Sequence, residues 1–129
     1  MTPHAGELGR MLGVDSEEIG RHRVRYAREA AARSKAIIVL KGDDTLVATP
    51  NGRVAVSRGH APALATAGTG DVLSGVIGAM LAKGLAPPHA ASAGVYAHLR
   101  AGQIAAAPDG PDGVIASDVI RALPAALGS

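Results

Sequence analysis

The chain of 129 residues contains no cysteine, phenylalanine or tryptophan, and only two tyrosines. The lack of cysteine excludes disulfide bonds, thiolate zinc sites and a cysteine nucleophile. Because aromatic side chains that could stack on bases are scarce and the formal net charge is only +2, we expect no nucleic-acid partner. Hydrophobic residues make up 47% of the chain, so a core can be built from Val, Ile, Leu and Ala.

Long apolar runs are missing as well. The longest run, residues 76–82, contains Gly78 and is far shorter than the ~20 residues of a membrane-spanning helix. The N-terminus lacks the apolar stretch of a signal peptide. We therefore expect a cytoplasmic protein with no membrane partner. Basic residues mixed with glutamates predict a solvated helix face, made up of Arg21, Arg23, Arg25, Arg28, Arg33 and Lys35.

A capping pattern begins the first long helix that we expect. Asp15 can act as the N-cap, and Glu18 follows three residues later, as in a capping box. The helix should run to about Ser34. The short apolar segment at residues 36–40 is typical of a buried strand.

The rest of the chain predicts a hairpin and three helices. Pro50-Asn51-Gly52 separates two strand-like segments and is typical of a hairpin turn. The expected elements are strands at 45–49 and 53–57, helices from about Thr69 to Lys83 and from about Pro88 to Ala106, and a final helix from Asp118 to Ala122 or beyond, capped by Ser117. This order of elements indicates an α/β layer architecture.

The first of three motifs that could carry chemistry is Thr2-Pro3-His4-Ala5-Gly6-Glu7. His4 and Glu7 are three residues apart, so they face the same side if the segment turns as a helix. Taken alone, a histidine and a glutamate near the beginning of a chain are more often frayed surface residues.

The second motif, Lys41-Gly42-Asp43-Asp44-Thr45, follows the strand expected at residues 36–40. Ligands of open α/β sheets bind beyond the carboxyl ends of the strands. Lys41 could therefore contact a phosphate, and Thr45 could form a hydrogen bond with a nucleotide. The alternative is an ordinary polar turn.

The third motif is Gly68-Thr69-Gly70-Asp71, at the beginning of an apolar helix. Glycines let a ligand approach the backbone closely, and the free N–H groups of a first helical turn favour an anion. Asp71 is an unusual neighbour for a phosphate unless it handles a proton or supports a metal ion, which points to phosphoryl transfer onto a hydroxyl group. The alternative is a plain helix start that Thr69 caps. The Walker pattern is not matched, so we do not expect a P-loop NTPase.

A fourth segment, residues 113–120 (Gly-Val-Ile-Ala-Ser-Asp-Val-Ile), completes a set that resembles the NAD(P)H-hydrate dehydratase family of carbohydrate-kinase-like enzymes. The resemblance extends from Thr2 to about Leu127. It implies an α/β fold, the ribokinase-like three-layer α/β/α sandwich, with only its C-terminal part present. It also implies ADP-dependent repair of (6S)-hydrated NADH or NADPH. In that reaction phosphate is transferred to the C6 hydroxyl and then eliminated, giving AMP and phosphate, while eukaryotic members use ATP.

The resemblance also implies roles for individual residues. Asp71 would be the catalytic base and would bind the hydrated cofactor together with His4. Glu7 would help to hold Mg²⁺ through water. The implied nucleotide-binding positions are Lys41, Gly42, Asp43, Asp44, Thr45, Gly68, Thr69 and Gly70.

Family members carry a further stretch of sheet and helices before the first motif. We therefore expect residues 1–129 to form a single partial domain, which acts as a homo-oligomer or needs the missing N-terminal half. Two alternatives stay open. One is a small-molecule kinase of the same fold, acting on a vitamin precursor or a sugar, and the other is a non-catalytic fragment or assembly subunit.

Overall fold

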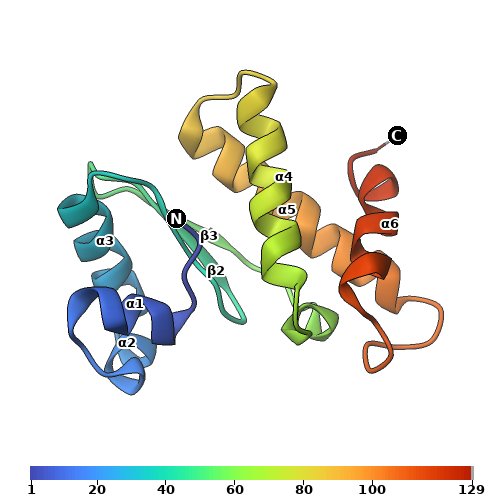
Figure 1. Cartoon of the computed structure of the whole chain (residues 1–129), viewed down its shortest axis with the longest axis horizontal. Helices are drawn as coiled ribbons and strands as arrows, with labels where there is room; N and C mark the ends of the chain where they lie inside the picture. The colour runs from blue at the N-terminus through green and yellow to red at the C-terminus, as the bar shows by residue number, and fades with distance from the viewer. Residues whose placement is uncertain (129) are drawn as a thin grey trace. The chain divides into compact units, whose positions relative to one another are not determined.

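The computed structural model describes residues 1–128, which form two compact units. The N-terminal unit comprises Met1–Arg58, and the C-terminal unit begins at Gly59 (Figure 1). Each unit has a hydrophobic core of its own.

The N-terminal unit combines three helices with a small sheet. Its elements are α1 (Ala5–Leu12), α2 (Ser16–Arg21), α3 (Arg23–Ser34), β1 (Ile38–Leu40), β2 (Thr45–Ala48) and β3 (Val54–Ser57). The strands form an antiparallel sheet in the order β1-β2-β3, with Val39 opposite Val47 and Leu46 opposite Val56. The predicted buried strand and the hairpin are both confirmed. Gly52 has a φ of 88°, a left-handed conformation that suits glycine in this turn.

The first three residues run alongside β1 as an additional, parallel segment. The nitrogen of Met1 donates a hydrogen bond to the carbonyl of Ile37 at 2.8 Å. The N–H of Val39 donates to the Met1 carbonyl at 2.8 Å, and the N–H of Lys41 donates to the Pro3 carbonyl at 2.9 Å. The paired residues advance in the same direction, as in a parallel ladder. The residues that follow this segment and β1 therefore lie at the same end of the sheet.

The helix expected to run from Asp15 to Ser34 is interrupted at His22, so that prediction is wrong at this residue. His22 has φ −134° and ψ 51°, outside the helical region, and it separates α2 from α3. Gly20 lies just before the break, and glycine is a weak helix former.

The predicted cap at Asp15 is confirmed, since its Oδ1 accepts a hydrogen bond from the N–H of Glu17 at 2.7 Å. Glu18, expected to complete a capping box, instead accepts a hydrogen bond from the Tyr26 hydroxyl at 3.1 Å. This bond joins α2 to α3 across the break at His22.

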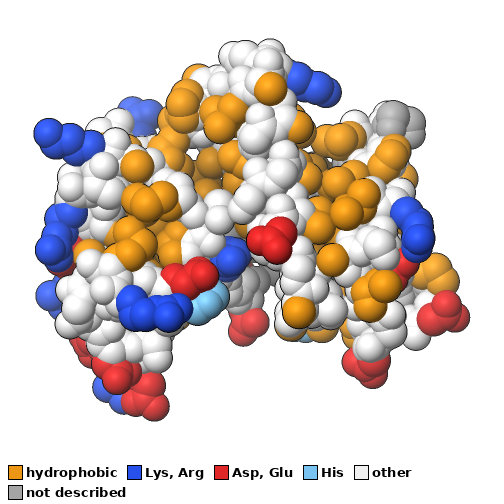
Figure 2. Space-filling model, in the orientation of Figure 1, with side chains coloured by type: hydrophobic (Ala, Val, Ile, Leu, Met, Phe, Trp, Pro, Cys, Tyr) orange, Lys and Arg blue, Asp and Glu red, His pale blue; other side chains and the backbone are white. Residues whose placement is uncertain are grey.

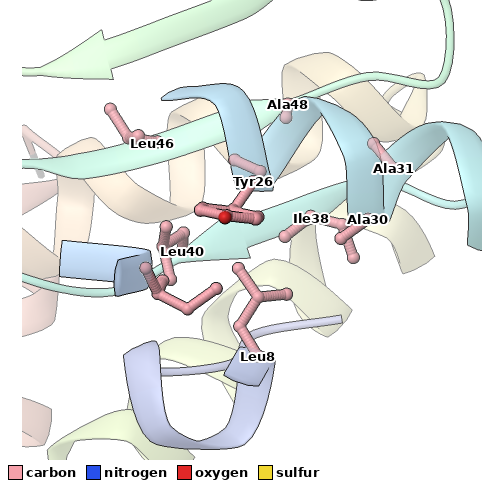
Figure 3. Packing of buried hydrophobic residues seen from close by; sticks show 10 residues of the cluster. Leu8, Tyr26, Ala30, Ala31, Ile38, Leu40, Leu46 and Ala48 are labelled. Atoms are coloured by element: carbon pink, nitrogen blue, oxygen red, sulfur yellow. The ribbon is translucent and has the colours of Figure 1, made fainter. Parts of the chain in front are cut away.

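Large aliphatic side chains fill the core of the N-terminal unit. Leu8 of α1 and Ile38 and Leu40 of β1 are fully buried and lie around the ring of Tyr26 from α3 (Figure 3). The helix α3 also turns small residues inward, which lets it lie close to the sheet: Ala27, Ala30 and Ala31.

The C-terminal unit is helical in the part that the structure describes. Its elements are the 3-10 helix η1 (Pro62–Ala65) and the helices α4 (Thr69–Ala82), α5 (Pro87–Ala106) and α6 (Ala116–Ala126). The helices predicted from Thr69 and from about Pro88 are confirmed. Glycines of α5 allow close packing, because a Cβ on Gly94 would lie 2.6 Å from Cγ1 of Ile77. A Cβ on Gly102 would lie 2.7 Å from Cδ2 of Leu64.

The final helix begins earlier than expected, so the prediction that Ser117 caps it is wrong. Ile115 is the N-cap, and Ser117 lies inside the first turn of α6. The N–H of Ile115 has no partner within the helix, and it donates a hydrogen bond to the Oδ2 of Asp118 at 3.1 Å. The carboxylate three residues into the helix performs the capping that the hydroxyl was expected to perform.

Within residues 1–128, no helix has both the length and the apolar character needed to span a membrane. Hydrophobic side chains do lie at the surface of the C-terminal unit, including Leu81 of α4, Tyr96 of α5 and Ile120 of α6. Figure 2 shows part of this apolar surface. The helix α4 carries apolar or small residues around most of its circumference, a composition typical of a helix enclosed by other elements.

Candidate functional site

His4 is the N-cap of α1, and Glu7 lies in the first turn of that helix and forms hydrogen bonds with His4. The Nδ1 of His4 accepts the N–H of Glu7 at 3.2 Å, and the Oε2 of Glu7 accepts the N–H of His4 at 2.8 Å. The His4 Nε2 also lies 3.6 Å from the Glu7 Oε1. The spacing thus brings the two side chains together as predicted, and both of them cap the helix.

The ionised form of Glu7 is favoured at this position. The hydrogen bond from the His4 backbone holds the pKa of Glu7 below its ordinary value, against a smaller opposing effect of burial. The charges of His4, Lys41 and Arg10 lower this pKa further. Because the side chain is 44% exposed, the carboxylate remains within reach of water or a ligand.

The second motif lies at the same end of the sheet as the first. The hydrogen bond between Lys41 and Pro3 places the end of β1 beside the residue that precedes His4. Lys41 and Thr45 are half-buried, whereas residues 42–44 between them are exposed. The expectation of a ligand at the carboxyl ends of strands applies to the parallel pair of residues 1–3 and β1, whereas β2 and β3 pair in antiparallel fashion.

Arg23 is a residue of this region that the sequence analysis missed. Its Nη2 donates a hydrogen bond to the carbonyl of Leu40 at 3.1 Å, and its guanidinium lies against Gly42. Arg28 likewise donates through Nε to the carbonyl of Gly52 at 2.9 Å. Arg23 is half-buried, so the interpretation of the basic cluster as a solvated face is wrong for this arginine, whereas Arg28 stays exposed while it holds the hairpin loop. No sequence pattern signals such a contact, because it joins residues that are distant along the chain.

The third motif forms the turn into α4. Gly68 is the N-cap with a φ of 86°, a conformation that favours glycine. Thr69 is buried, and its Oγ1 donates to the carbonyls of Leu64 at 2.6 Å and Thr66 at 2.8 Å. Thr69 therefore does not cap the helix with its side chain but secures the turn from within. Asp71 is exposed in the first turn of α4.

The backbone N–H groups of this turn differ in whether they are already bonded. Those of Asp71 and Val72 donate to the carbonyl of Gly68 at 3.1 and 3.2 Å. Among the hydrogen bonds found in residues 1–128, none uses the N–H of Gly70. An amide in the first turn of a helix, beside a glycine without a side chain, is suited to an anion.

The fourth motif packs against the third. The Oγ1 of Thr66 donates to the carbonyl of Val114 at 3.1 Å, and a Cβ on Gly68 would lie 3.3 Å from the Cβ of Ala116. The beginnings of α4 and α6 are therefore neighbours. The spatial relation between these motifs is set by residues that are 48 positions apart in the chain.

A cavity of about 460 Å³ lies next to the fourth motif, between the end of α5 and α6. Asp109, Gly113, Asp118 and Arg121 are among its lining residues, and Arg121 pairs with Asp118 at 2.9 Å. None of the predicted site residues lines this cavity. Across residues 1–128, no three His, Cys, Asp or Glu side chains are grouped so that they could hold a metal ion by themselves.

Comparison with known proteins gives a consistent result. The model of a family described as NAD(P)H-hydrate dehydratase matches residues 1–125. The bifunctional NAD(P)H-hydrate repair enzyme Nnr of Thermofilum pendens is 45% identical over 127 residues, covering 98% of this chain and 24% of that protein. The ADP-dependent (S)-NAD(P)H-hydrate dehydratase of Xanthomonas campestris is 35% identical and is covered to 44% of its length.

Solved structures agree with these relatives. The ADP/ATP-dependent NAD(P)H-hydrate dehydratase of Bacillus subtilis, co-crystallised with ATP/Mg²⁺, has a TM-score of 0.93 and 36% identity over 98% of this chain and 46% of its own. A ribokinase-like superfamily protein of Enterococcus faecalis has a TM-score of 0.80 and 30% identity over 98% of this chain and 43% of its own. The predicted ribokinase-like fold is thus confirmed. The chain spans less than half the length of these proteins, and it belongs to the NAD(P)H-hydrate dehydratase family.

Proposed function

We propose that the chain is the part of an ADP-dependent (6S)-NAD(P)H-hydrate dehydratase that supplies the catalytic base and much of the nucleotide site. The observation that carries this proposal is the pairing of the motifs. The N-terminal unit joins the first motif to the second at one sheet end, through the hydrogen bond from Lys41 to Pro3. The C-terminal unit joins the third to the fourth, through the hydrogen bond from Thr66 to Val114.

In this proposal Asp71 accepts the proton of the C6 hydroxyl as that oxygen attacks the terminal phosphoryl group of ADP. The new oxygen–phosphorus bond replaces the bond to AMP, which leaves. The N–H of Gly70 and the neighbouring glycine turn stabilise the charge on the transferring group. Asp71 fits the role of the base because it is exposed beside that turn.

The second step is elimination. Hydroxide is a poor leaving group, whereas phosphate leaves readily. The lone pair of the ring nitrogen assists cleavage of the bond between C6 and oxygen, and loss of a proton from C5 restores the double bond. Free phosphate and NADH or NADPH are the products.

The remaining predicted residues receive binding roles. His4, together with Asp71, contacts the hydrated cofactor. The nucleotide is held by Lys41, Gly42, Asp43, Asp44, Thr45, Gly68, Thr69 and Gly70. The structure favours a backbone role for Thr69, because its buried hydroxyl donates to Leu64 and Thr66.

Mg²⁺ fits this set of residues through Glu7. Protein sites for Mg²⁺ usually combine one or two carboxylates with waters and substrate phosphates, so a cluster of three protein ligands is not required. Glu7 is ionised and partly exposed. Because both of its oxygens already lie near His4, a water between Glu7 and Mg²⁺ fits better than direct coordination. When bound, Mg²⁺ neutralises charge on the phosphates of the nucleotide.

We also propose that residues 1–129 belong to a single partial domain, completed by the half that relatives carry in addition or by self-association. The exposed apolar side chains of α4 and α5 support a covering partner, since Leu81 is 44% and Tyr96 60% exposed.

The test is recovery of NADH absorbance when the purified chain meets (6S)-hydrated NADH, Mg²⁺ and ADP, with ATP in a parallel reaction. We expect recovery that depends on the nucleotide, with AMP and phosphate formed in equal amounts from ADP. The same assay is repeated with the missing half supplied as a second chain. Absence of recovery in both forms, from folded protein, would refute the proposal.

A second assay addresses the kinase alternative. Hydroxylated vitamin precursors and sugars are offered with ATP, and a stable phosphorylated product would favour a small-molecule kinase. A folded chain that binds no nucleotide and forms no product would instead indicate a non-catalytic fragment or assembly subunit.

A further inference from the structure

We propose that Arg23 is the positioning residue of the nucleotide-binding segment at residues 41–45, with its guanidinium lying against Gly42. The inference rests on the proposed function, because it assigns a support to a segment proposed there to hold the nucleotide. Arg23 itself is not placed in contact with substrate or nucleotide.

The geometry of the contact is specific. The Nη2 of Arg23 donates to the carbonyl of Leu40, the last residue of β1, at 3.1 Å. A Cβ on Gly42 would lie 2.5 Å from that Nη2, 2.8 Å from Cζ and 3.2 Å from Nη1. Three atoms of the guanidinium group therefore lie close to the space that a side chain at this position would occupy. Since a real Cβ does not approach so closely, any other residue at position 42 must displace the arginine.

The backbone of Gly42 gives no separate reason for glycine. Its φ is not among the positive values that glycines adopt in this chain. An alanine would therefore be compatible with the backbone, and the conflict would lie with Arg23 alone. The guanidinium of Arg23 is therefore the group that a side chain at position 42 would have to displace.

The chemistry of arginine suits this role better than that of lysine. A planar guanidinium can lie flat against a glycine and still direct one N–H at a carbonyl, whereas an ammonium group is a compact point charge. The bond from Arg23 fixes Leu40 one residue before Lys41, at the point where the chain leaves β1. Without this support residues 41–45 keep their attachments at the ends of β1 and β2 and the hydrogen bond from Lys41 to Pro3.

The experiment compares ADP binding, measured by calorimetry with Mg²⁺, in wild type and four variants. These are Arg23→Ala, Arg23→Lys, Gly42→Ala and the double variant Arg23→Ala/Gly42→Ala. Amide hydrogen exchange of residues 41–45 and the melting temperature are recorded for each. A matched control is Arg28→Ala, which removes an arginine bond to the Gly52 carbonyl from the same helix, but at the other end of the sheet.

We expect Arg23→Ala to weaken ADP binding about tenfold, as for loss of a charge-assisted hydrogen bond, and to accelerate exchange at residues 41–45. Arg23→Lys should recover little of the affinity, because its charge remains but its planar group is lost. Gly42→Ala should resemble Arg23→Ala, since both separate the guanidinium from Leu40. The double variant should bind no more weakly than the weaker single variant, because both changes break one interaction.

The inference is overturned if Arg23→Ala binds ADP as wild type does, if it matches Arg28→Ala in affinity and exchange, or if the two changes add. Full recovery in Arg23→Lys would also overturn it, by assigning the effect to charge alone. If Arg23→Ala fails to fold, the ADP affinities of Arg23→Lys and Gly42→Ala are used instead. Weaker binding in both variants supports the inference, and wild-type affinity in both overturns it. A folded wild-type chain that binds neither ADP nor ATP is a different result, because it refutes the proposed function and this inference with it.

Discussion

The cores of the two units differ in the size of the side chains that fill them. The N-terminal unit buries large side chains such as Leu8, Ile38 and Leu40, all fully enclosed. The buried core of the C-terminal unit consists of alanines and valines: Ala63, Ala101, Val114, Val119 and Ala122. Its helices approach each other closely at glycines of α5. The first unit should therefore be sensitive to loss of side-chain volume, and the second to its addition.

The units also differ in the chemistry that they offer. The N-terminal unit brings a histidine, a glutamate and a lysine to one end of its sheet, groups suited to binding a charged ligand. The C-terminal unit offers a helix start with an exposed carboxylate, suited to proton transfer beside a phosphate. Changes in the first unit should therefore affect mainly binding, whereas a change at Asp71 should affect turnover.

The largest effect is expected for Asp71→Asn. An amide cannot accept the proton, so turnover should fall by about 10²–10⁴-fold. The melting temperature should fall only slightly, because Asp71 is exposed and its charge in the first turn of α4 contributes at most about 1 kcal/mol. Turnover is measured as the rate at which NADH absorbance recovers under saturating ADP. Asp112→Asn, in an exposed loop of the same unit, is the control and should behave as wild type. Retained turnover in Asp71→Asn would remove this residue from the role of base.

Leu40→Ala tests the large-residue core of the N-terminal unit. The side chain is fully buried, so its truncation should lower the free energy of unfolding by about 2–5 kcal/mol. Denaturant unfolding followed by hydrogen exchange in α3 and β1 measures the change in this unit. Leu81→Ala, at a leucine that is 44% exposed, is the control and should cost much less. An equal loss of unfolding free energy in Leu40→Ala and Leu81→Ala would show that burial of the leucine does not set its contribution to stability.

Two glycine substitutions test the C-terminal unit. Gly94→Ala places a methyl group against Ile77, which should cost about 1–3 kcal/mol of unfolding free energy, offset in part by the higher helix propensity of alanine. Gly78→Ala meets nothing within 4 Å and should instead stabilise α4 by roughly 0.8–1.0 kcal/mol through propensity alone. Thermal unfolding of both variants should therefore shift in opposite directions. Shifts of the same sign would contradict the close packing of α4 and α5.

The smallest effect is expected for Glu7→Gln at the start of α1. The pKa of Glu7 is lowered in the folded chain, so its ionised form contributes stability above the ordinary glutamate pKa. That contribution is lost as the pH falls from the ordinary value through the lowered one. Glu7→Gln should cost roughly 0.5–1 kcal/mol at neutral pH and converge with wild type in acid.

Unfolding curves between neutral and acid pH check this expectation. The control is Glu17→Gln, which alters an exposed pair with Arg21 at 3.7 Å and should change stability by at most about 1 kcal/mol. If the difference in unfolding free energy between Glu7→Gln and wild type stays constant over the whole pH range, the ionised carboxylate does not have this role.

Much of the local structure followed from sequence. The cap at Asp15, the hairpin around Gly52 and the helix from Thr69 were predicted from residue types that act over a few positions. The single helix up to Ser34 was wrong, because a lone Gly20 is too weak a signal to predict that the backbone leaves the helical region at His22. The cap assigned to Ser117 was wrong as well, because Asp118 satisfies the earlier N–H of Ile115.

The features of the candidate site also divide into those that the sequence predicted and those that it did not. Glycine, threonine and aspartate at 68–71 indicated an anion-binding helix start, and His4 and Glu7 were expected on one side of a turn. The buried direction of the Thr69 hydroxyl was not foreseen, because it depends on carbonyls presented by η1. Arg23 was grouped with solvated residues, because its partner Leu40 is 17 positions away.

The sequence by itself determined the starts of α2 and α4, the hairpin turn and the family, since these depend on the order of residue types along a short stretch. Only the tertiary structure decided that residues 1–3 pair in parallel with β1, which places the first motif beside the second. It also decided that Arg23 lies on Gly42 and that the turn at Gly68 lies on Ala116. The physical reason is that these contacts join residues distant in the chain, and each forms only when packing of a whole unit brings its partners together.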